Sequence, residues 1–302
     1  MKITILLIIL AIFLKTIFLF SILNYDPSLK VPDLDSKYYL DLAKNIKKGI
    51  WIPQPEGYYL LSPGYSFFLG LIPYKEGNYL PIYLIQLLFG AISVGLIKLL
   101  GTNLFGKKAG ILAALIFLFY GPVTFYELRI LSESLLSFLI LLFFLFFYSK
   151  KTILNWISGF LLGVLYLLRP NLLLFWIFIL FWAILKERKK LLGIIFGLPF
   201  LFVIPVINFI GSGEILGTSA QAGIAFYMGN NPNSYGLFSN PIGFRGDIDE
   251  MAKQVKNFVK LKTGKEMTPF QINIFWINKS FEWAKKNPLV FLNNFVLKIQ
   301  RT

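Results

Sequence analysis

The chain has 302 residues, of which 56% are hydrophobic, and it carries a formal net charge of +15. It contains no cysteine and no histidine, which excludes disulfides, thiol catalysis, Cys/His zinc sites and histidine-based triads. Any acid–base chemistry therefore falls to Asp, Glu, Lys or Tyr, and any metal site would use oxygen ligands, which suit Mg²⁺ or Mn²⁺.

Apolar runs of about twenty residues recur along the sequence, and each is long enough to cross a hydrocarbon core of roughly 30 Å. The basic residues form no single cluster of the kind that binds nucleic acid, so nucleic acid is not an expected partner. Loops at a membrane surface explain the basic excess better. The sequence predicts an all-α integral membrane protein with about seven transmembrane helices.

The first predicted span covers residues 3–23. It is too long for a signal peptide, and no cleavage site follows it. Lys15 lies inside this span and is expected to face the interior of the bundle. Six further spans are predicted at residues 79–100, 109–126, 130–148, 153–168, 171–185 and 191–210. Pro170 separates the fifth from the sixth, because proline breaks a helix.

The short loops predict the orientation of the chain. One set carries Lys107, Lys108, Lys150, Lys151, Lys186, Arg188, Lys189 and Lys190. The opposite set carries only Arg129 and Arg169. Because positive residues favour the cytoplasmic side, we expect a multi-pass protein of the cell (inner) membrane with a cytoplasmic N-terminus. Residues 1–210 then form a transmembrane domain with an outer loop at 24–78, and residues 211–302 form an outer-face segment.

The outer-face segment is predicted to be folded and mostly helical. Turn residues gather at 229–232, and helices are expected near 249–262 and 269–286. Thr268 before Pro269 is a favoured helix start. Residues 289–299 are apolar but too few to span a membrane. They are either the opening of an eighth helix that has been cut off, so that the chain is an N-terminal portion, or an interfacial helix that closes the domain.

The outer loop is predicted to contain a helix lying along the membrane surface. Tyr38 and Tyr39 fall on its apolar face, at headgroup level, and Gly49 ends it. Asp33 and Asp35 lie at its N-terminus, just outside the bilayer. Asp35 is either the N-cap of this helix or a functional carboxylate.

A second outer corner carries Arg129 and Glu133. They are four residues apart and form either a local ion pair or part of a site, because Glu133 lies at the edge of an apolar span where ionisable groups are costly. Arg169 is a third outer-face feature, and it either snorkels to lipid phosphates or binds substrate. Together these groups suit an anionic, membrane-borne substrate, since the planar fork of arginine fits phosphate.

Six motifs carry a resemblance to a known family. They are Asp35-Ser36-Lys37-Tyr38-Tyr39-Leu40-Asp41-Leu42-Ala43, Ser62-Pro63-Gly64-Tyr65, Ile85-Gln86-Leu87, Leu131-Ser132-Glu133-Ser134-Leu135, Leu167-Leu168-Arg169-Pro170 and Tyr227-Met228-Gly229-Asn230-Asn231-Pro232. In this order they make the chain resemble the GT-C superfamily of membrane glycosyltransferases, in the branch related to protein O-mannosyltransferases and the lipid A aminoarabinose transferase. The family's further helices and C-terminal outer domain are absent.

The resemblance implies an inverting transfer of a sugar from a polyprenyl-phosphate donor to an acceptor hydroxyl at the outer, periplasmic face. The acceptor is a protein, a lipid or a glycan. Asp35 is then expected to take the acceptor's proton, and Arg169 and Arg129 are expected to stabilise the phosphate that leaves. Glu133 is the second catalytic carboxylate and is expected to orient Arg129, the acceptor or a metal.

The remaining expected contacts are with the substrate and the membrane. Asp33, Tyr38 and Tyr39 join the two arginines as substrate-binding residues, and membrane lipids are expected partners. No cofactor is certain. A divalent cation, Mg²⁺ or Mn²⁺, would be held by Asp35 and Glu133.

The alternative is a non-catalytic membrane protein, either a lipid-linked sugar carrier or an inactive scaffold relative. A transporter is expected to show broken helices or polar residues deep in several spans. The predicted spans are mostly Leu, Ile and Phe in their middle parts, with Lys15 as the main exception. The polar residues gather at the outer rim instead, which favours the enzyme.

Overall fold

The computed structural model describes residues 2–240 and 242–301. Every regular element within these ranges is a helix. The chain divides into two compact units, of which unit 1 comprises Met1–Trp51 and Ser62–Val203, and unit 2 comprises Ile52–Leu61 and Ile204–Thr302. The boundary between Val203 and Ile204 lies close to residue 210, where the sequence predicted the end of the transmembrane domain. The segment Ile52–Leu61, which we assigned to the outer loop of the first domain, belongs to unit 2 instead.

Unit 1 contains the apolar helices expected from the sequence together with two others. The apolar helices are α1 (Lys2–Ile22), α4 (Leu80–Phe105), α5 (Lys107–Phe119), α6 (Gly121–Glu127), α7 (Glu133–Phe147), α8 (Thr152–Leu168), α9 (Leu173–Lys186) and α10 (Leu191–Phe196). The other two are α2 (Leu34–Lys47) and α3 (Gly64–Leu71), and α11 (Phe200–Ser212) continues from unit 1 into unit 2.

Three helical segments are long and apolar enough to cross a membrane: Lys2–Ile22, Leu80–Phe105 and Arg188–Ser212. A fourth arises if α5 and α6, which meet at a bend of 58°, form one broken span. Three further apolar helices, Glu133–Phe147, Thr152–Leu168 and Pro170–Lys186, have 10–17 residues. Helices therefore occupy all seven predicted positions, and three or four of them have the length and composition of a full span.

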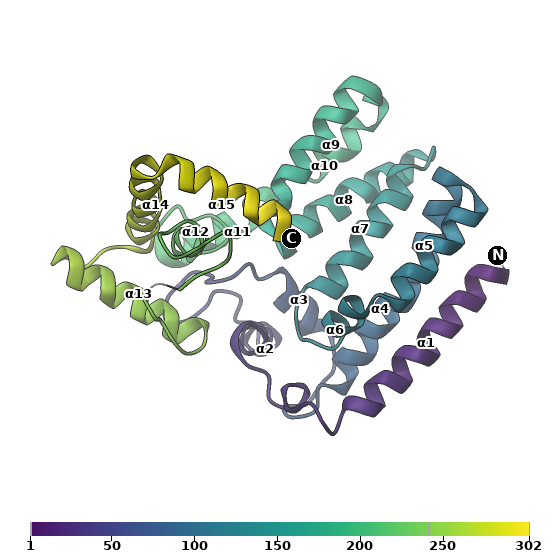
Figure 1. Cartoon of the computed structure of the whole chain (residues 1–302), viewed down its shortest axis with the longest axis horizontal. Helices are drawn as coiled ribbons and strands as arrows, with labels where there is room; N and C mark the ends of the chain where they lie inside the picture. Colours follow the sequence, from purple (N-terminus) through teal and green to yellow (C-terminus); the bar gives the residue numbers. More distant parts are fainter. Residues whose placement is uncertain (1, 241, 302) are drawn as a thin grey trace. The chain divides into compact units, whose positions relative to one another are not determined.

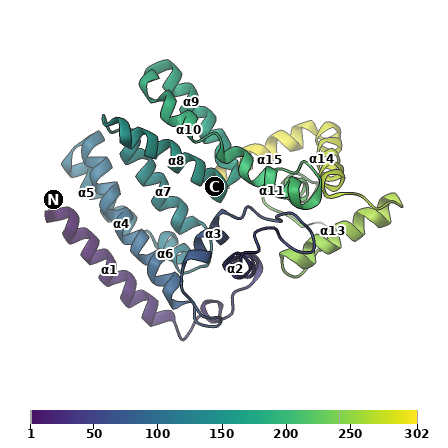
Figure 2. The ribbon, with the colours of Figure 1, turned by 180° about the vertical axis from the view of Figure 1, so that it is seen from behind.

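The helices of unit 1 lie side by side. Helix α4 packs between α1 and α5 and also contacts α7, which in turn packs on α8. Both views place α2, α3 and α6 at the end of this bundle away from the N-terminus (Figures 1 and 2). The connections from α4 to α5 and from α7 to α8 lie at the other end, on the side of the N-terminus.

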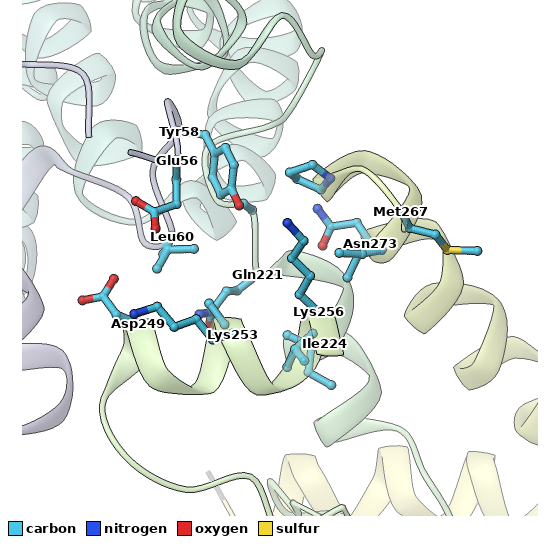
Figure 3. A pocket seen from close by; sticks show the side chains of 15 residues that line it. Glu56, Tyr58, Leu60, Gln221, Ile224, Asp249, Lys253, Lys256, Met267 and Asn273 are labelled. Carbon is cyan, nitrogen blue, oxygen red and sulfur yellow. The ribbon is translucent and has the colours of Figure 1, made fainter. Parts of the chain in front are cut away.

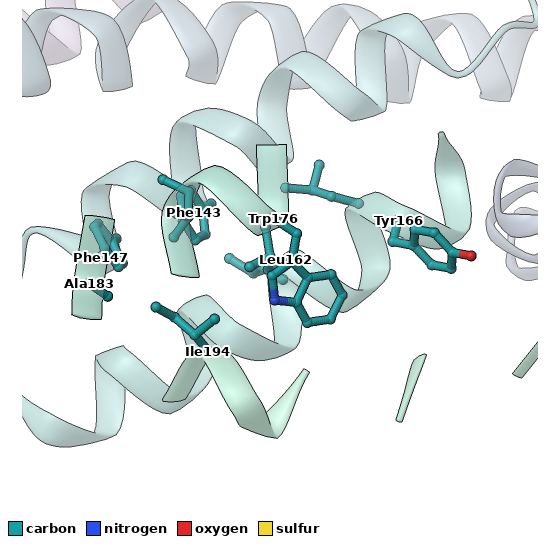
Figure 4. Close-up of a cluster of buried hydrophobic side chains, with 10 residues drawn as sticks. Phe143, Phe147, Leu162, Tyr166, Trp176, Ala183 and Ile194 are labelled. Carbon is teal, nitrogen blue, oxygen red and sulfur yellow. The ribbon is translucent and has the colours of Figure 1, made fainter. Parts of the chain in front are cut away.

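Glycines set the close approach of α8 and α10. A Cβ on Gly159 would lie 1.6 Å from the carbonyl oxygen of Gly193, and one on Gly197 would lie 2.3 Å from that of Gly159. The small residues of these helices thus permit close packing within one chain. An apolar cluster that includes Phe143, Trp176 and Ile194 packs among α7, α8, α9 and α10 (Figure 4).

Helix α2 is amphipathic, and its tyrosines are buried. Asp33 occupies the N-cap position, so the interpretation of Asp35 as the N-cap is wrong, because Asp35 lies in the first turn. Tyr38 and Tyr39 are each 8% exposed, and the Tyr39 ring meets Tyr65 of α3 edge-on at 5.3 Å. Both rings are thus buried within the protein, because α2 packs its aromatic face on α3, and their expected position at headgroup level stays a prediction.

Unit 2 is helical as expected. It contains α12 (Ala222–Gly229), α13 (Ile248–Thr263), α14 (Pro269–Lys286) and α15 (Pro288–Arg301). Thr268 caps α14 in a capping box with Gln271, which confirms the predicted start of this helix. Trp276 is 1% exposed and centres an apolar core with residues of α12 and α13.

Hydrogen bonds hold the segment Ile52–Leu61 within unit 2. The backbone N–H of Tyr59 donates to Asn208 Oδ1 at 2.9 Å, and the N–H of Ala220 donates to the carbonyl oxygen of Tyr59 at 2.9 Å. A Cβ on Gly57 would lie 2.4 Å from the carbonyl oxygen of Gly211. This segment therefore packs on the end of α11 and the loop that follows it.

Candidate functional site

Arg169 is the centre of the candidate site. Helix α8 ends at Leu168, and Arg169 adopts an extended conformation before Pro170. Its guanidinium forms an ion pair with Glu133 at the start of α7 and donates to Ser132 Oγ at 3.2 Å. Arg169 therefore has a protein carboxylate as a partner, and its two expected roles, contact with lipid phosphates and substrate binding, stay predictions.

Asp35 shares the electrostatic environment of Arg169. Burial raises the pKa of the half-buried Asp35 carboxyl, and the Arg169 guanidinium opposes that rise. The pKa of Tyr39 is raised to about 12, chiefly by burial and further by Asp35, while Arg169 again opposes the change. The site therefore combines a carboxyl group whose pKa is raised, a guanidinium, and a phenol that keeps its proton at neutral pH.

The predicted motifs of unit 1 meet around this site. Tyr65 donates to Gln86 Oε1 at 2.6 Å, and Gln86 Nε2 donates to the carbonyl oxygens of Glu127 and Arg129 at 2.8 Å each. Ser62 Oγ donates to the carbonyl oxygen of Leu167 at 2.6 Å. Helices α3 and α4 and the turn before Arg169 are thus joined by hydrogen bonds that also hold the corner between α6 and α7.

Arg129 does not pair with Glu133, so the expected local ion pair is wrong. Helix α7 begins only at Glu133, so Arg129 lies in the bend before it and the spacing of four residues does not place the two on one helix face. Arg129 instead pairs with Asp26 at 2.7 Å and packs over the Phe125 ring. The pKa of Asp26 is lowered, first by its hydrogen bond from Ser28 and then by Arg129.

Of the seven predicted site residues, Asp35, Tyr39, Glu133 and Arg169 come together. Tyr38 lies beside them, with its ring centroid 6.2 Å from that of Tyr39. Asp33 is exposed at the N-cap of α2, and within the described chain its side chain makes no capping hydrogen bond. Arg129 belongs to the neighbouring pair with Asp26.

The expected metal site is not favoured by the donor set. Within residues 2–240 and 242–301 there is no group of three or more Asp and Glu side chains that is able to hold a metal ion. The two proposed ligands, Asp35 and Glu133, both face the Arg169 guanidinium, which would repel a divalent cation placed between them. These residues do not fit a Mg²⁺ or Mn²⁺ site.

A buried ion pair between Lys15 and Glu127 was not predicted. Lys15 Nζ lies 2.5 Å from Glu127 Oε2, and each side chain is 2% exposed. Lys15 also donates to Thr124 Oγ1 at 3.2 Å. Its expected position in the bundle interior is confirmed. The partner was missed, although a cation inside an apolar span implies a nearby carboxylate.

Each unit contains a cavity near charged groups. In unit 1 a cavity of about 270 Å³ is bordered by Glu127 and Glu133. In unit 2 a cavity of about 180 Å³ is bordered by Tyr58, Gln221 and residues of α13 and α14 (Figure 3). Burial raises the pKa of Tyr58, and Glu56 adds to the rise. The sequence indicated neither cavity.

No family model, curated protein or solved structure matches the chain.

Proposed function

We propose that this protein is an inverting membrane glycosyltransferase of the GT-C type. It transfers a sugar from a polyprenyl-phosphate donor to an acceptor hydroxyl of a protein, lipid or glycan. One observation carries the proposal: Asp35, Glu133 and Arg169 come from segments far apart in sequence and share one electrostatic environment. A carboxylate base beside an arginine is the arrangement that this transfer requires.

Asp35 is the base. Its carboxylate accepts the proton of the acceptor hydroxyl as the oxygen attacks the anomeric carbon, and the bond from that carbon to the donor phosphate breaks through an oxocarbenium-like state. The electron pair of the broken bond stays on the phosphate, and the Arg169 guanidinium stabilises the charge that develops there. Atoms and charge balance without a further reactant.

Glu133 and Tyr39 support this chemistry. Glu133 holds the Arg169 guanidinium in place through their ion pair, because a long arginine side chain otherwise samples many conformations. Tyr39 keeps its proton, since its pKa is raised to about 12, and is available as a hydroxyl donor to the substrate. Arg129 pairs with Asp26, so it has no role toward the donor phosphate in this proposal.

We place the chain in the cell (inner) membrane as a multi-pass protein with a cytoplasmic N-terminus. The lysine-rich connections from α4 to α5 and from α7 to α8 lie on the side of the N-terminus, and α2 and α3 lie at the opposite end of unit 1 (Figure 1). This arrangement supports an outer-face site, because cytoplasmic loops are rich in Lys and Arg. In this proposal all seven apolar segments cross, and local thinning of the bilayer accommodates the three short ones.

The decisive experiment is sugar transfer in proteoliposomes. The assay supplies radiolabelled polyprenyl-phosphate sugars and a crude acceptor extract. Asp35→Asn is expected to lower the transfer rate by about 10²–10⁴-fold, the usual contribution of a general base. Asp41→Asn, on the same helix, is the matched control and is expected to retain activity. Equal transfer by wild type and Asp35→Asn would contradict the assignment of the base.

A lipid-linked sugar carrier is the second candidate, and two observations favour it. The break of 58° between α5 and α6 and the buried Lys15–Glu127 pair are features of transporters rather than of simple spans. The test is movement of a fluorescent polyprenyl-phosphate sugar between leaflets of the same proteoliposomes without acceptor. Protein-dependent movement together with no transfer would favour the carrier over the enzyme.

A further inference from the structure

The cavity beside Glu127 and Glu133 is lined by residues from four helices, and many of them carry polar groups. It occupies about 270 Å³ within unit 1 and lies among α4, α5, α6 and α7. The residues whose polar groups border it are Ser93, Tyr120, Tyr126, Glu127, Glu133, Ser134 and Ser137. Tyr120 and Tyr126 are 57% and 41% exposed, so aromatic rings stand at its outer edge. Asp35 does not border it.

Two carboxylate oxygens at this cavity are buried and unsatisfied. Glu127 Oε1 and Glu133 Oε2 have no hydrogen-bond partner within the described part of the chain. The Glu127 side chain is only 2% exposed, so bulk solvent does not satisfy it. Buried polar groups are nearly always hydrogen-bonded in folded proteins. The pair of open acceptors therefore points to a ligand that donates hydrogen bonds.

The charges around the cavity indicate what kind of donor fits. Glu127 is already paired with Lys15 at 2.5 Å, and Glu133 is already paired with Arg169. Two negative and two positive side chains leave no net charge to hold a metal cation or an ammonium group. A neutral hydroxyl gains from such a site, because a hydrogen bond to an ionised acceptor is the stronger kind.

We propose that this cavity is a subsite for a neutral, polyhydroxylated group, the ring of a sugar. Its hydroxyls donate to Glu127 and Glu133, and serine hydroxyls, which donate and accept, supply further contacts. Identifying this ring with the transferred sugar rests on the proposed function. Glu127 is then a substrate-binding residue that distinguishes a sugar-bearing lipid phosphate from the bare lipid phosphate.

The test measures binding rather than transfer. The complete chain is reconstituted in nanodiscs and titrated with farnesyl phosphoryl mannose, glucose and galactose, and separately with farnesyl phosphate. In the wild type at least one sugar compound is expected to bind more tightly than farnesyl phosphate. Glu127→Gln is expected to weaken that compound at least tenfold and to leave farnesyl phosphate unchanged. Glu282→Gln, an exposed substitution in α14, is the matched control.

A second variant covers the case in which Glu127→Gln does not fold, because that change leaves Lys15 buried beside a neutral amide. Ser137→Leu places a larger apolar side chain at the cavity and leaves the Lys15–Glu127 pair intact. It is expected to remove the sugar-dependent gain in affinity. Ser21→Leu is its control, since Ser21 lies exposed at the end of α1.

The outcomes separate this inference from the proposed function. No sugar-dependent affinity in the wild type, or unchanged sugar affinity in folded Ser137→Leu, overturns the subsite. Sugar-dependent binding that needs Glu127, together with no transfer by the wild type, overturns the proposed function and leaves the subsite standing. Asp35→Asn is expected to keep sugar-dependent binding and to lose transfer.

Discussion

The buried pair between Lys15 and Glu127 predicts a strong energetic coupling between α1 and α6. Replacing Lys15 by Met leaves Glu127 as an uncompensated buried carboxylate, and replacing Glu127 by Leu leaves an uncompensated ammonium. Removing one partner of a buried pair costs about 3–5 kcal/mol. Each single variant is therefore expected to lose that amount of unfolding free energy.

The double variant Lys15→Met with Glu127→Leu is expected to recover most of this loss. Apolar side chains of similar volume replace a buried ion pair at little cost, and sometimes stabilise the fold. The two helices approach closely, with Lys15 Nζ 2.5 Å from Glu127 Oε2, so both substitutions act on one contact. The double variant is expected within about 1.5 kcal/mol of the wild type, the usual limit for volume-conserving changes.

The measurement is equilibrium unfolding in mixed micelles of dodecyl maltoside and sodium dodecyl sulfate, followed by tryptophan fluorescence. The control is the exposed pair of Lys44 and Glu76, whose side chains are 54% and 80% exposed. Its single variants are expected to cost less than about 1 kcal/mol. Additive costs for Lys15 and Glu127 would refute the argument, because two residues that share one buried contact are coupled.

Three further predictions concern other parts of the chain. Arg169→Gln removes the cation that opposes the raised pKa of Asp35, so the acid limb of the rate–pH profile at saturating substrate is expected to move to higher pH, since the base acts only when ionised. Gly159→Ala is expected to cost about 1–3 kcal/mol in the unfolding assay through overpacking, whereas Gly121→Ala, with open space around its Cβ, is expected to change little. Thr268→Ala is expected to lower unfolding free energy by about 1 kcal/mol through loss of the cap on α14, measured by urea denaturation.

The sequence predicted best what local chemistry decides. Helix α14 begins at Pro269 and ends at Lys286, as expected. Its start is decided within one turn, by Thr268, Pro269 and Gln271. The apolar runs gave the positions of helices in unit 1, since a long apolar stretch forms a helix whatever its neighbours are. Helix α2 was located in the same way, from its pattern and from Gly49, which has a positive φ of 79°.

The sequence predicted least where an outcome depends on a distant segment. Arg129 and Glu133 satisfy the spacing of an ion pair, but the chain bends between them, and their partners come from residues 26 and 169. Lys15 was expected in the interior, yet nothing near it in the sequence indicates Glu127 as its partner, because the two residues are 112 positions apart. The start of α7 also escaped the pattern, since the predicted span begins at residue 130 and the helix begins only at Glu133.

Two ion pairs, each between a glutamate and a basic residue, explain why the candidate site tolerates so much charge in an apolar chain. Glu127 with Lys15 and Glu133 with Arg169 form two compensated pairs, and each uses only one oxygen of its carboxylate, because the second oxygen has no partner among the described residues. A pair of this kind has its charge compensated by the cation and still offers one acceptor oxygen for a hydrogen bond to a ligand. Neutral overall charge with open acceptors is the combination expected of the proposed sugar subsite, and Asp35, which does not border the cavity, stays available as the proposed base.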